Sequence, residues 1–249
     1  MQSVIPAEEK EVTYTEFLPC EALRPFIYCY WELKSPPRNT PFFYRVVADG
    51  CIDLFFECDN PQMSSLMGYC NTYVEIPIMG AFHYVGVRFL PSAFPLLFGQ
   101  DAFEISAQEI PLREVVPALA TFITQQLETP LSLPATAQHL DDYFLRHLSQ
   151  RPLQIDNRFF SALSQILQSK GTIHISELDT GISTRQLRRL FDYYIGDNPK
   201  TFSNIVRFQH ILSAKAYHNH SFLDTYYDQA HFIKSFKTFY GDTPSKVLG

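Results

Sequence analysis

The stretch GISTRQLRRLF, residues 181–191, says more about the fold than any other part of this 249-residue sequence. Gly181 permits a sharp left-handed turn, and Ser183 followed three residues later by Gln186 forms a capping box, which marks a helix start. A short segment, a glycine turn and a capped helix predict a helix-turn-helix, whose second helix can enter the DNA major groove. The alternative for this stretch alone is a solvated arginine face on an ordinary helix pair. Helical spacing places its apolar side chains on one face and its arginines on the other: Arg185, Arg188 and Arg189.

A second copy of the pattern lies near the C-terminus. Residues 187–199 read LRRLFDYYIGDNP, and residues 232–244 read FIKSFKTFYGDTP. Both have an apolar residue, a cation and a phenylalanine at alternate positions, and both end in Gly-x-x-Pro. Two such units predict two recognition helices that contact successive segments of the major groove.

In these two segments the sequence resembles the AraC/XylS family of bacterial transcription regulators, and the resemblance covers about residues 159–247. Shorter matches to an N-terminal companion of that family occur at residues 24–31, 49–54 and 86–91. The resemblance implies a cytoplasmic regulator that binds double-stranded DNA, with an N-terminal effector or dimerisation domain. A small-molecule effector, a second copy of the chain and RNA polymerase are the further partners we expect. By the same resemblance, the DNA contacts are assigned to Arg185, Arg188, Arg189, Gln229 and Lys234.

The segments that precede both predicted recognition helices are shorter than the family pattern. Fewer residues separate Leu178 from Gly181, and residues 220–226 replace an Ile-Ala pair and a glycine turn. Lys234 also stands where arginine is usual, which loses bidentate hydrogen bonding. These departures keep a second function open, that of a regulatory or protein-interaction protein that retains the fold with weakened or lost DNA binding.

Charge is distributed unevenly along the chain. Residues 1–150 carry 8 Lys and Arg against 18 Asp and Glu, a net charge of −10. Residues 151–249 carry 12 against 8, a net charge of +4. Opposite signs in the two halves indicate separate roles, and the basic half favours an anionic partner.

Aromatic and β-branched residues dominate the first part of the chain and predict β-structure. The Asp49-Gly50 pair predicts a hairpin between the second and third predicted strands. Several short strands with regular turn signals predict a β-sandwich or a small barrel. The strands are expected over residues 26–34, 42–48, 51–58, 65–76 and 82–89.

Beyond residue 91 the apolar period becomes helical. The fold class is therefore α+β, with an N-terminal β-sandwich or barrel-like domain over residues 1–150 that carries helices at about 111–149. An all-α double helix-turn-helix domain follows over residues 151–249. Helices are expected over residues 92–99, 111–128, 134–149, 156–171, 184–194 and 199–217, followed by a short pair over 224–240.

Side chains of the predicted strands are candidates for an effector pocket, and we name Trp31, Phe55, Tyr84 and Arg88. The alternative is that the aromatic residues are simply core. Arg88 lies in an otherwise almost apolar strand, so it needs a partner, and Asp53 and Asp49 are the candidates.

The sequence predicts no catalytic residue, no metal site and no cofactor. It contains no G-x-S-x-G, no glycine-rich phosphate loop and no H-E-x-x-H, and its five cysteines form no C-x-x-C. Because these motifs are missing, we do not expect an enzyme. No apolar run approaches the length of a membrane span, so we do not expect a membrane protein.

Overall fold

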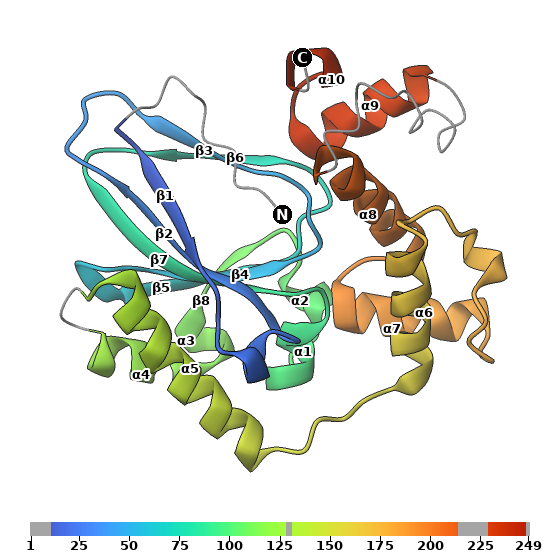
Figure 1. Ribbon diagram of the computed structural model, residues 1–249, viewed down its shortest axis with the longest axis horizontal. Coiled ribbons are helices and arrows are strands. Elements are labelled where there is room, and N and C mark those ends of the chain that lie inside the picture. The colour runs from blue at the N-terminus through green and yellow to red at the C-terminus, as the bar shows by residue number, and fades with distance from the viewer. Residues whose placement is uncertain (1–10, 128–130, 214–228, 248–249) are drawn as a thin grey trace.

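The computed structural model of the protein describes residues 11–127, 131–213 and 229–247. An antiparallel sheet covered by helices forms the N-terminal part, and helices alone form the C-terminal part (Figure 1). The predicted α+β class is confirmed. No helix in the described ranges is long and apolar enough to cross a membrane.

The main sheet has six strands in the order β1-β2-β7-β4-β5-β8, and β3 and β6 form a separate two-stranded ribbon. All of the pairings are antiparallel. The strands are β1 (Thr13–Phe17), β2 (Ile27–Ser35), β3 (Phe42–Val46), β4 (Ile52–Glu57), β5 (Asn60–Met67), β6 (Val74–Ile78), β7 (Phe82–Phe89) and β8 (Glu109–Pro111).

The two faces of the main sheet pack against different partners. Alternation along β4 sends Leu54 and Phe56 to the helix-covered face, whereas Asp53 and Phe55 face the ribbon. On the helical side, Phe89 of β7 packs edge-to-face on Phe144 of α5, with ring centroids 5.7 Å apart. The helices of this part are η1 (Glu21–Leu23), α1 (Ala93–Phe98), α2 (Ala102–Ile105), α3 (Leu112–Val115), α4 (Pro117–Gln126) and α5 (Leu133–Gln150).

The predicted hairpin at Asp49-Gly50 is wrong. Gly50 does have a φ of +79°, but β3 pairs with β6, and β4 pairs with β5 and β7. The connection leaves the sheet because Val47 and Ala48 bury themselves among the C-terminal helices. There the Ala48 amide donates a hydrogen bond to the Phe239 carbonyl at 3.1 Å. A distant partner thus outweighs the local turn signal.

Two further predicted elements are each divided in the structure. The strand expected over 65–76 is the end of β5 and the start of β6, which belong to different sheets. The helix expected over 111–128 is broken into α3 and α4 at Val116, whose φ of −134° is not helical. Pro117 follows it, and a proline disfavours the helical conformation of the residue before it.

The C-terminal part consists of helices around an aromatic core. As predicted, Asp156 caps the first helix, since its carboxylate accepts a hydrogen bond from the Arg158 amide at 3.0 Å. The expected end of the 199–217 helix, the start of the 224–240 pair and the replaced segment 220–226 lie outside the described residues. The helices are α6 (Asn157–Gln168), η2 (Ile175–Glu177), α7 (Thr184–Ile195), α8 (Pro199–Ser213), α9 (Gln229–Tyr240) and α10 (Pro244–Val247).

Three residues of the N-terminal part, Val47, Ala48 and Tyr69, belong to the hydrophobic core of the C-terminal helices. The chain passes from α5 to α6 through non-helical residues 151–156, near the predicted boundary at residue 150. The division into two domains at that boundary stays a prediction, and the shared core is a feature that the sequence did not reveal.

Candidate functional site

Helix α7 begins at the capping box that the sequence predicts. The Ser183 hydroxyl accepts a hydrogen bond from the Gln186 amide at 3.3 Å, and the Gln186 side chain accepts one from the Ser183 amide at 3.1 Å. Gly181 has a φ of +66° with open space around it, so the left-handed backbone alone favours glycine there. Leu187 and Phe191 are buried. The predicted cap, turn and core face of this helix are confirmed.

The three arginines of α7 are all exposed, but their surroundings differ. Arg188 approaches Asp192, one turn further along, at 3.9 Å. Arg189 lines an open groove between α7 and α2, together with Asp101 and Asp192. Asp192 therefore lowers the positive potential around both Arg188 and Arg189, whereas Arg185 is paired with no carboxylate in the part of the chain that the structure describes.

Helix α9 has the same pattern of burial as α7. Phe232 and Phe236 are buried, and Lys234 between them is exposed, as is Gln229 at the start of the helix. Lys237 lies three residues after Lys234 and is also exposed. The sequence analysis missed Lys237, although its i,i+3 spacing from Lys234 signals a shared face.

The two helices also end in the same way. Gly196 follows α7 with a φ of +99°, and Gly241 follows α9 with a φ of +95°. Pro199 and Pro244 then begin the next helices, α8 and α10. The repeat in the sequence is therefore a repeat in the structure, which makes α7 and α9 equivalent candidate recognition helices.

The shortened segment before α7 is a single 3-10 turn, η2, rather than an α-helix. Helix α6 holds the chain beyond this turn. The Gln165 side chain donates a hydrogen bond to the Asp179 carbonyl at 3.1 Å and accepts one from the Asp179 amide at 3.2 Å. The Gln165 side chain thus provides part of the support that the missing helical turn would give.

The N-terminal part contacts the glycine turns of both candidate recognition helices. Ser106 donates a hydrogen bond to the Gly196 carbonyl at 3.1 Å, and a Cβ at Gly196 would overlap the same hydroxyl. The Tyr73 amide donates to the Thr238 carbonyl at 3.1 Å, and a Cβ at Gly241 would lie 2.7 Å from the Tyr73 ring. The sheet region thus holds the C-terminal ends of both helices.

The ribbon β3/β6 has helix α9 on one face and a cavity on the other. Arg45 of β3 points toward α9, where its guanidinium lies 5.6 Å from the centroid of the Tyr240 ring. Its neighbours Tyr44 and Val46 line the cavity on the opposite face, as strand alternation requires. A change in the position of the ribbon would therefore reach both the cavity and α9.

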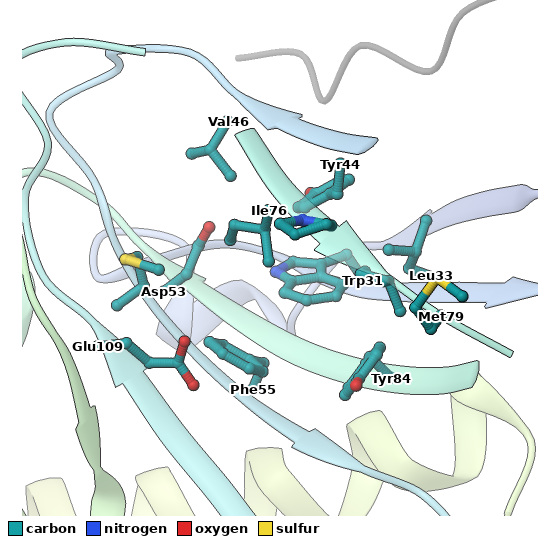
Figure 2. A pocket seen from close by; sticks show the side chains of 13 residues that line it. Trp31, Leu33, Tyr44, Val46, Asp53, Phe55, Ile76, Met79, Tyr84 and Glu109 are labelled. Carbon is teal, nitrogen blue, oxygen red and sulfur yellow. The ribbon is translucent and has the colours of Figure 1, made fainter. Parts of the chain in front are cut away.

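The cavity has a volume of about 270 Å³ and lies between the ribbon and the main sheet (Figure 2). Three of the four predicted pocket residues line it: Trp31, Phe55 and Tyr84. Arg88 is not among the lining residues. Sequence reasoning missed the ribbon side of the cavity, although the alternation VEIPI in β6 could have signalled it. The role of these residues in binding a ligand stays a prediction.

A row of aromatic residues crosses the floor of the cavity. Gly86 of β7 is paired with Trp31 of β2 on one side and with Phe55 of β4 on the other. A Cβ at Gly86 would overlap the indole, so glycine lets the Trp31 ring lie flat against the sheet. The Phe55 ring is 6.4 Å from Trp31 and 6.2 Å from Tyr84, and it meets Tyr84 edge-to-face.

The next row of the sheet carries charge. Arg88 is paired with Asp53, Asp53 with Met67, and Met67 with Glu109. The Arg88 guanidinium is 2% exposed and donates to both Asp53 oxygens, with Nε–Oδ1 at 3.0 Å and Nη2–Oδ2 at 2.8 Å. Asp49 lies 3.8 Å away. The structural ion pair suggested for Arg88 is thereby confirmed, with both predicted partners.

Burial governs the ionisation of this cluster. Burial alone would lower the pKa of the Arg88 guanidinium, but the carboxylates of Asp53 and Asp49 raise it well above its ordinary value. Burial raises the pKa of the Asp49 carboxyl, and the attraction of Arg88 opposes that rise. Arg88 is therefore a fixed cation that neutralises Asp53.

Comparison with known proteins gives two matches. A family described as "Domain of unknown function (DUF6597)" matches residues 15–111, which run from within β1 to the end of β8. The match therefore covers the strands together with η1, α1 and α2, and it leaves α3 to α10 outside. No curated protein matches the sequence.

Among solved structures, the chain is similar to "Crystal Structure of ToxT from Vibrio Cholerae O395". The two chains share 11% identity with a TM-score of 0.42, over 96% of this chain and 98% of the other. At that TM-score the likeness does not establish a common fold, so no function is inferred from it.

Proposed function

We propose that this protein is a transcription regulator of the AraC/XylS type, which binds double-stranded DNA in a sequence-specific manner through α7 and α9. The observation that carries the proposal is the structural repeat. Two helices share one pattern of burial, end in the same glycine turn and present exposed polar side chains: Arg185, Arg188, Arg189, Gln229, Lys234 and Lys237.

Different contacts are proposed for the two helices. Arg185 and Arg188 can each form two hydrogen bonds to a guanine in the major groove. Lys234 and Lys237 of α9 are point charges, which suit phosphate oxygens better than base edges. Sequence selectivity would then come mainly from α7, and α9 would fix the position of the protein on the duplex.

Regulation by a small molecule in the cavity is the second part of the proposal. The cavity and α9 share the ribbon β3/β6, with Tyr44 on one face and Arg45 on the other. A ligand that displaces the ribbon would therefore change how α9 is held. A ligand can shift the protein only as far as it binds the two arrangements unequally.

One observation favours the alternative function, a regulatory or interaction protein with weakened DNA binding. A scaffold of one 3-10 turn, η2, supports α7 less extensively than an α-helix would. The hydrogen bonds between Gln165 and Asp179 compensate in part, which is why DNA binding remains the preferred proposal.

The salt dependence of duplex affinity separates these two functions. We expect the affinity for a 40-base-pair duplex of random sequence to fall with KCl concentration with a log–log slope of about −4. This slope follows if the exposed cations of α7 and α9 replace condensed counterions. Fluorescence anisotropy between 50 and 200 mM KCl measures it. A slope near zero, or no binding at low salt, would favour the interaction protein.

Three further assignments belong to the proposal. They are a domain boundary near residue 150, a homodimer formed through residues 1–150, and contact with RNA polymerase. The first is supported by the two hydrophobic cores, which lie on either side of residues 151–156 except that Val47, Ala48 and Tyr69 belong to the C-terminal one. The other two come from the family resemblance alone.

A further inference from the structure

We infer that the cavity between the ribbon and the main sheet binds a small organic cation, one with an apolar body and a hydrogen-bond acceptor within it. The inference deepens the proposed regulation, on which it rests only for calling the ligand an effector. Binding itself is a property of the cavity and does not require DNA.

The charge of the cavity wall is the first reason. Asp53 and Glu109 line the cavity, and the described residues that line it include no arginine, lysine or histidine. Arg88 neutralises Asp53 through two hydrogen bonds. Glu109, by contrast, has no cationic partner in the part of the chain that the structure describes. An anionic ligand would meet an uncompensated carboxylate, whereas a cation would pair with it.

The aromatic floor is the second reason. Phe55 of β4 lies 6.4 Å from Trp31 of β2 and 6.2 Å from Tyr84 of β7, the strand between them. Their rings are tilted or perpendicular to one another, so a cation in the cavity can meet more than one ring face. Such contacts attract ammonium groups, and tryptophan is the strongest partner.

An unsatisfied donor is the third reason. Trp31 is 4% exposed, yet its Nε1 has no hydrogen-bond partner among the residues that the structure describes. Figure 2 shows this nitrogen on the side of the indole ring that is turned toward Asp53. A buried N–H without a partner is costly. An ether, carbonyl or ring-nitrogen acceptor in the body of the ligand would satisfy it.

Size sets the limit on the ligand. A volume of about 270 Å³ is near the lower end of the range for small-molecule sites. The register places Glu109 two strands from Asp53, so the Cα atoms of these two residues lie about 10 Å apart across the floor. One aromatic ring with a short amine-bearing chain fits that span.

Trp31 supplies the measurement, because it is the only tryptophan in the sequence. We would titrate the full chain, without DNA, with three nearly isosteric probes: 2-phenoxyethylamine, 2-phenoxyethanol and phenoxyacetate. The first is expected to change Trp31 fluorescence saturably and to bind about tenfold more tightly than the alcohol. Phenoxyacetate is expected to bind weakest. Replacing the ether oxygen of the amine by CH₂, in 3-phenylpropylamine, is expected to weaken binding about threefold.

Two variants test the assigned roles. Glu109→Gln is expected to lower the affinity for 2-phenoxyethylamine about threefold to fivefold and to leave that for the alcohol unchanged. Tyr84→Leu is expected to lower the affinity for 2-phenoxyethylamine about fivefold, because the variant loses one ring face. The matched control is Glu104→Gln, which removes an exposed carboxylate of α2 outside the cavity.

Three outcomes would overturn the inference: no saturable change with the amine, equal or tighter binding of the alcohol or of phenoxyacetate, or an unchanged amine preference in Glu109→Gln. All three are independent of DNA affinity, so failure of the ligand assignment is distinguishable from failure of the proposed regulator. Binding of the amine without salt-dependent duplex affinity would support this inference and contradict the proposed function.

Discussion

Replacing Asp53 by alanine is expected to lower the free energy of unfolding by about 3 kcal/mol. The Arg88 guanidinium is 2% exposed, and two of its hydrogen bonds go to the Asp53 carboxylate. Without that carboxylate, the anionic partner that remains for the buried Arg88 cation among the described residues is Asp49, at 3.8 Å. Breaking one partner of a buried pair costs about 3–5 kcal/mol, and the remaining Asp49 favours the lower end of that range.

Thermal unfolding measures the loss. For a chain of this size, 3 kcal/mol corresponds to a decrease in Tm of roughly 6–12 °C. The control is Lys246→Ala, which breaks an exposed pair with Asp242 at 3.2 Å and is expected to change stability by less than about 1 kcal/mol. Asp53→Asn keeps the shape of the side chain and one acceptor oxygen. Its loss of stability is expected to lie between those of Asp53→Ala and Lys246→Ala. Equal effects of Asp53→Ala and Lys246→Ala would show that the buried pair does not stabilise the fold.

Reversing two charges on α7 is expected to lower duplex affinity at least about 100-fold. In the double variant Arg188→Glu/Arg189→Glu, two exposed cations of the proposed recognition helix become anions. Each well-placed arginine contact contributes about 1–3 kcal/mol, and the new carboxylates add repulsion from the phosphates. Both side chains are exposed, so the fold is expected to remain stable.

The matched control for this variant is Arg113→Glu/Arg146→Glu, which changes the net charge by the same amount on exposed residues of α3 and α5. It is expected to lower affinity less than about threefold at 150 mM salt, because screening limits the reach of distant charges. Affinity of the α7 variant equal to that of this control would remove α7 from the DNA interface.

Local signals were sufficient to predict the candidate recognition helices. Ser183 and Gln186 determine the start of α7, and Gly196 directly after the helix determines its end, so each signal lies at the helix terminus that it sets. The same holds for the core face of α9, where phenylalanines recur at helical spacing. Capping and helical periodicity act over one or two turns, so they can be recognised in the sequence without knowledge of the rest of the fold.

Long-range pairings were not predictable in this way. The ribbon joins β3 to β6 across a large separation in the chain, and the local Asp49-Gly50 turn signal pointed to a different partner. Tyr69 and Ala48 look like ordinary strand or loop residues, yet they complete the core of the C-terminal helices. Nothing in their own neighbourhood in the sequence identifies that core.

The cavity was predictable in part for the same reason. Trp31, Phe55 and Tyr84 lie on paired strands whose alternation the sequence displays, so their shared face could be anticipated. Glu109 lies in β8, a strand of three residues that is too short to show alternation. Its place beside the aromatic floor follows only from its pairing with Met67 of β5.

Selection from a library of random duplexes directly tests whether the chain binds DNA in a sequence-specific manner. The full chain is incubated with the library at 150 mM salt, and the retained duplexes are sequenced over successive rounds. We expect the unaltered chain to enrich one sequence motif, and we expect the Arg188→Glu/Arg189→Glu variant not to enrich it. Libraries that stay random after selection by the unaltered chain, or the same motif enriched equally by the charge-reversed chain, would contradict it.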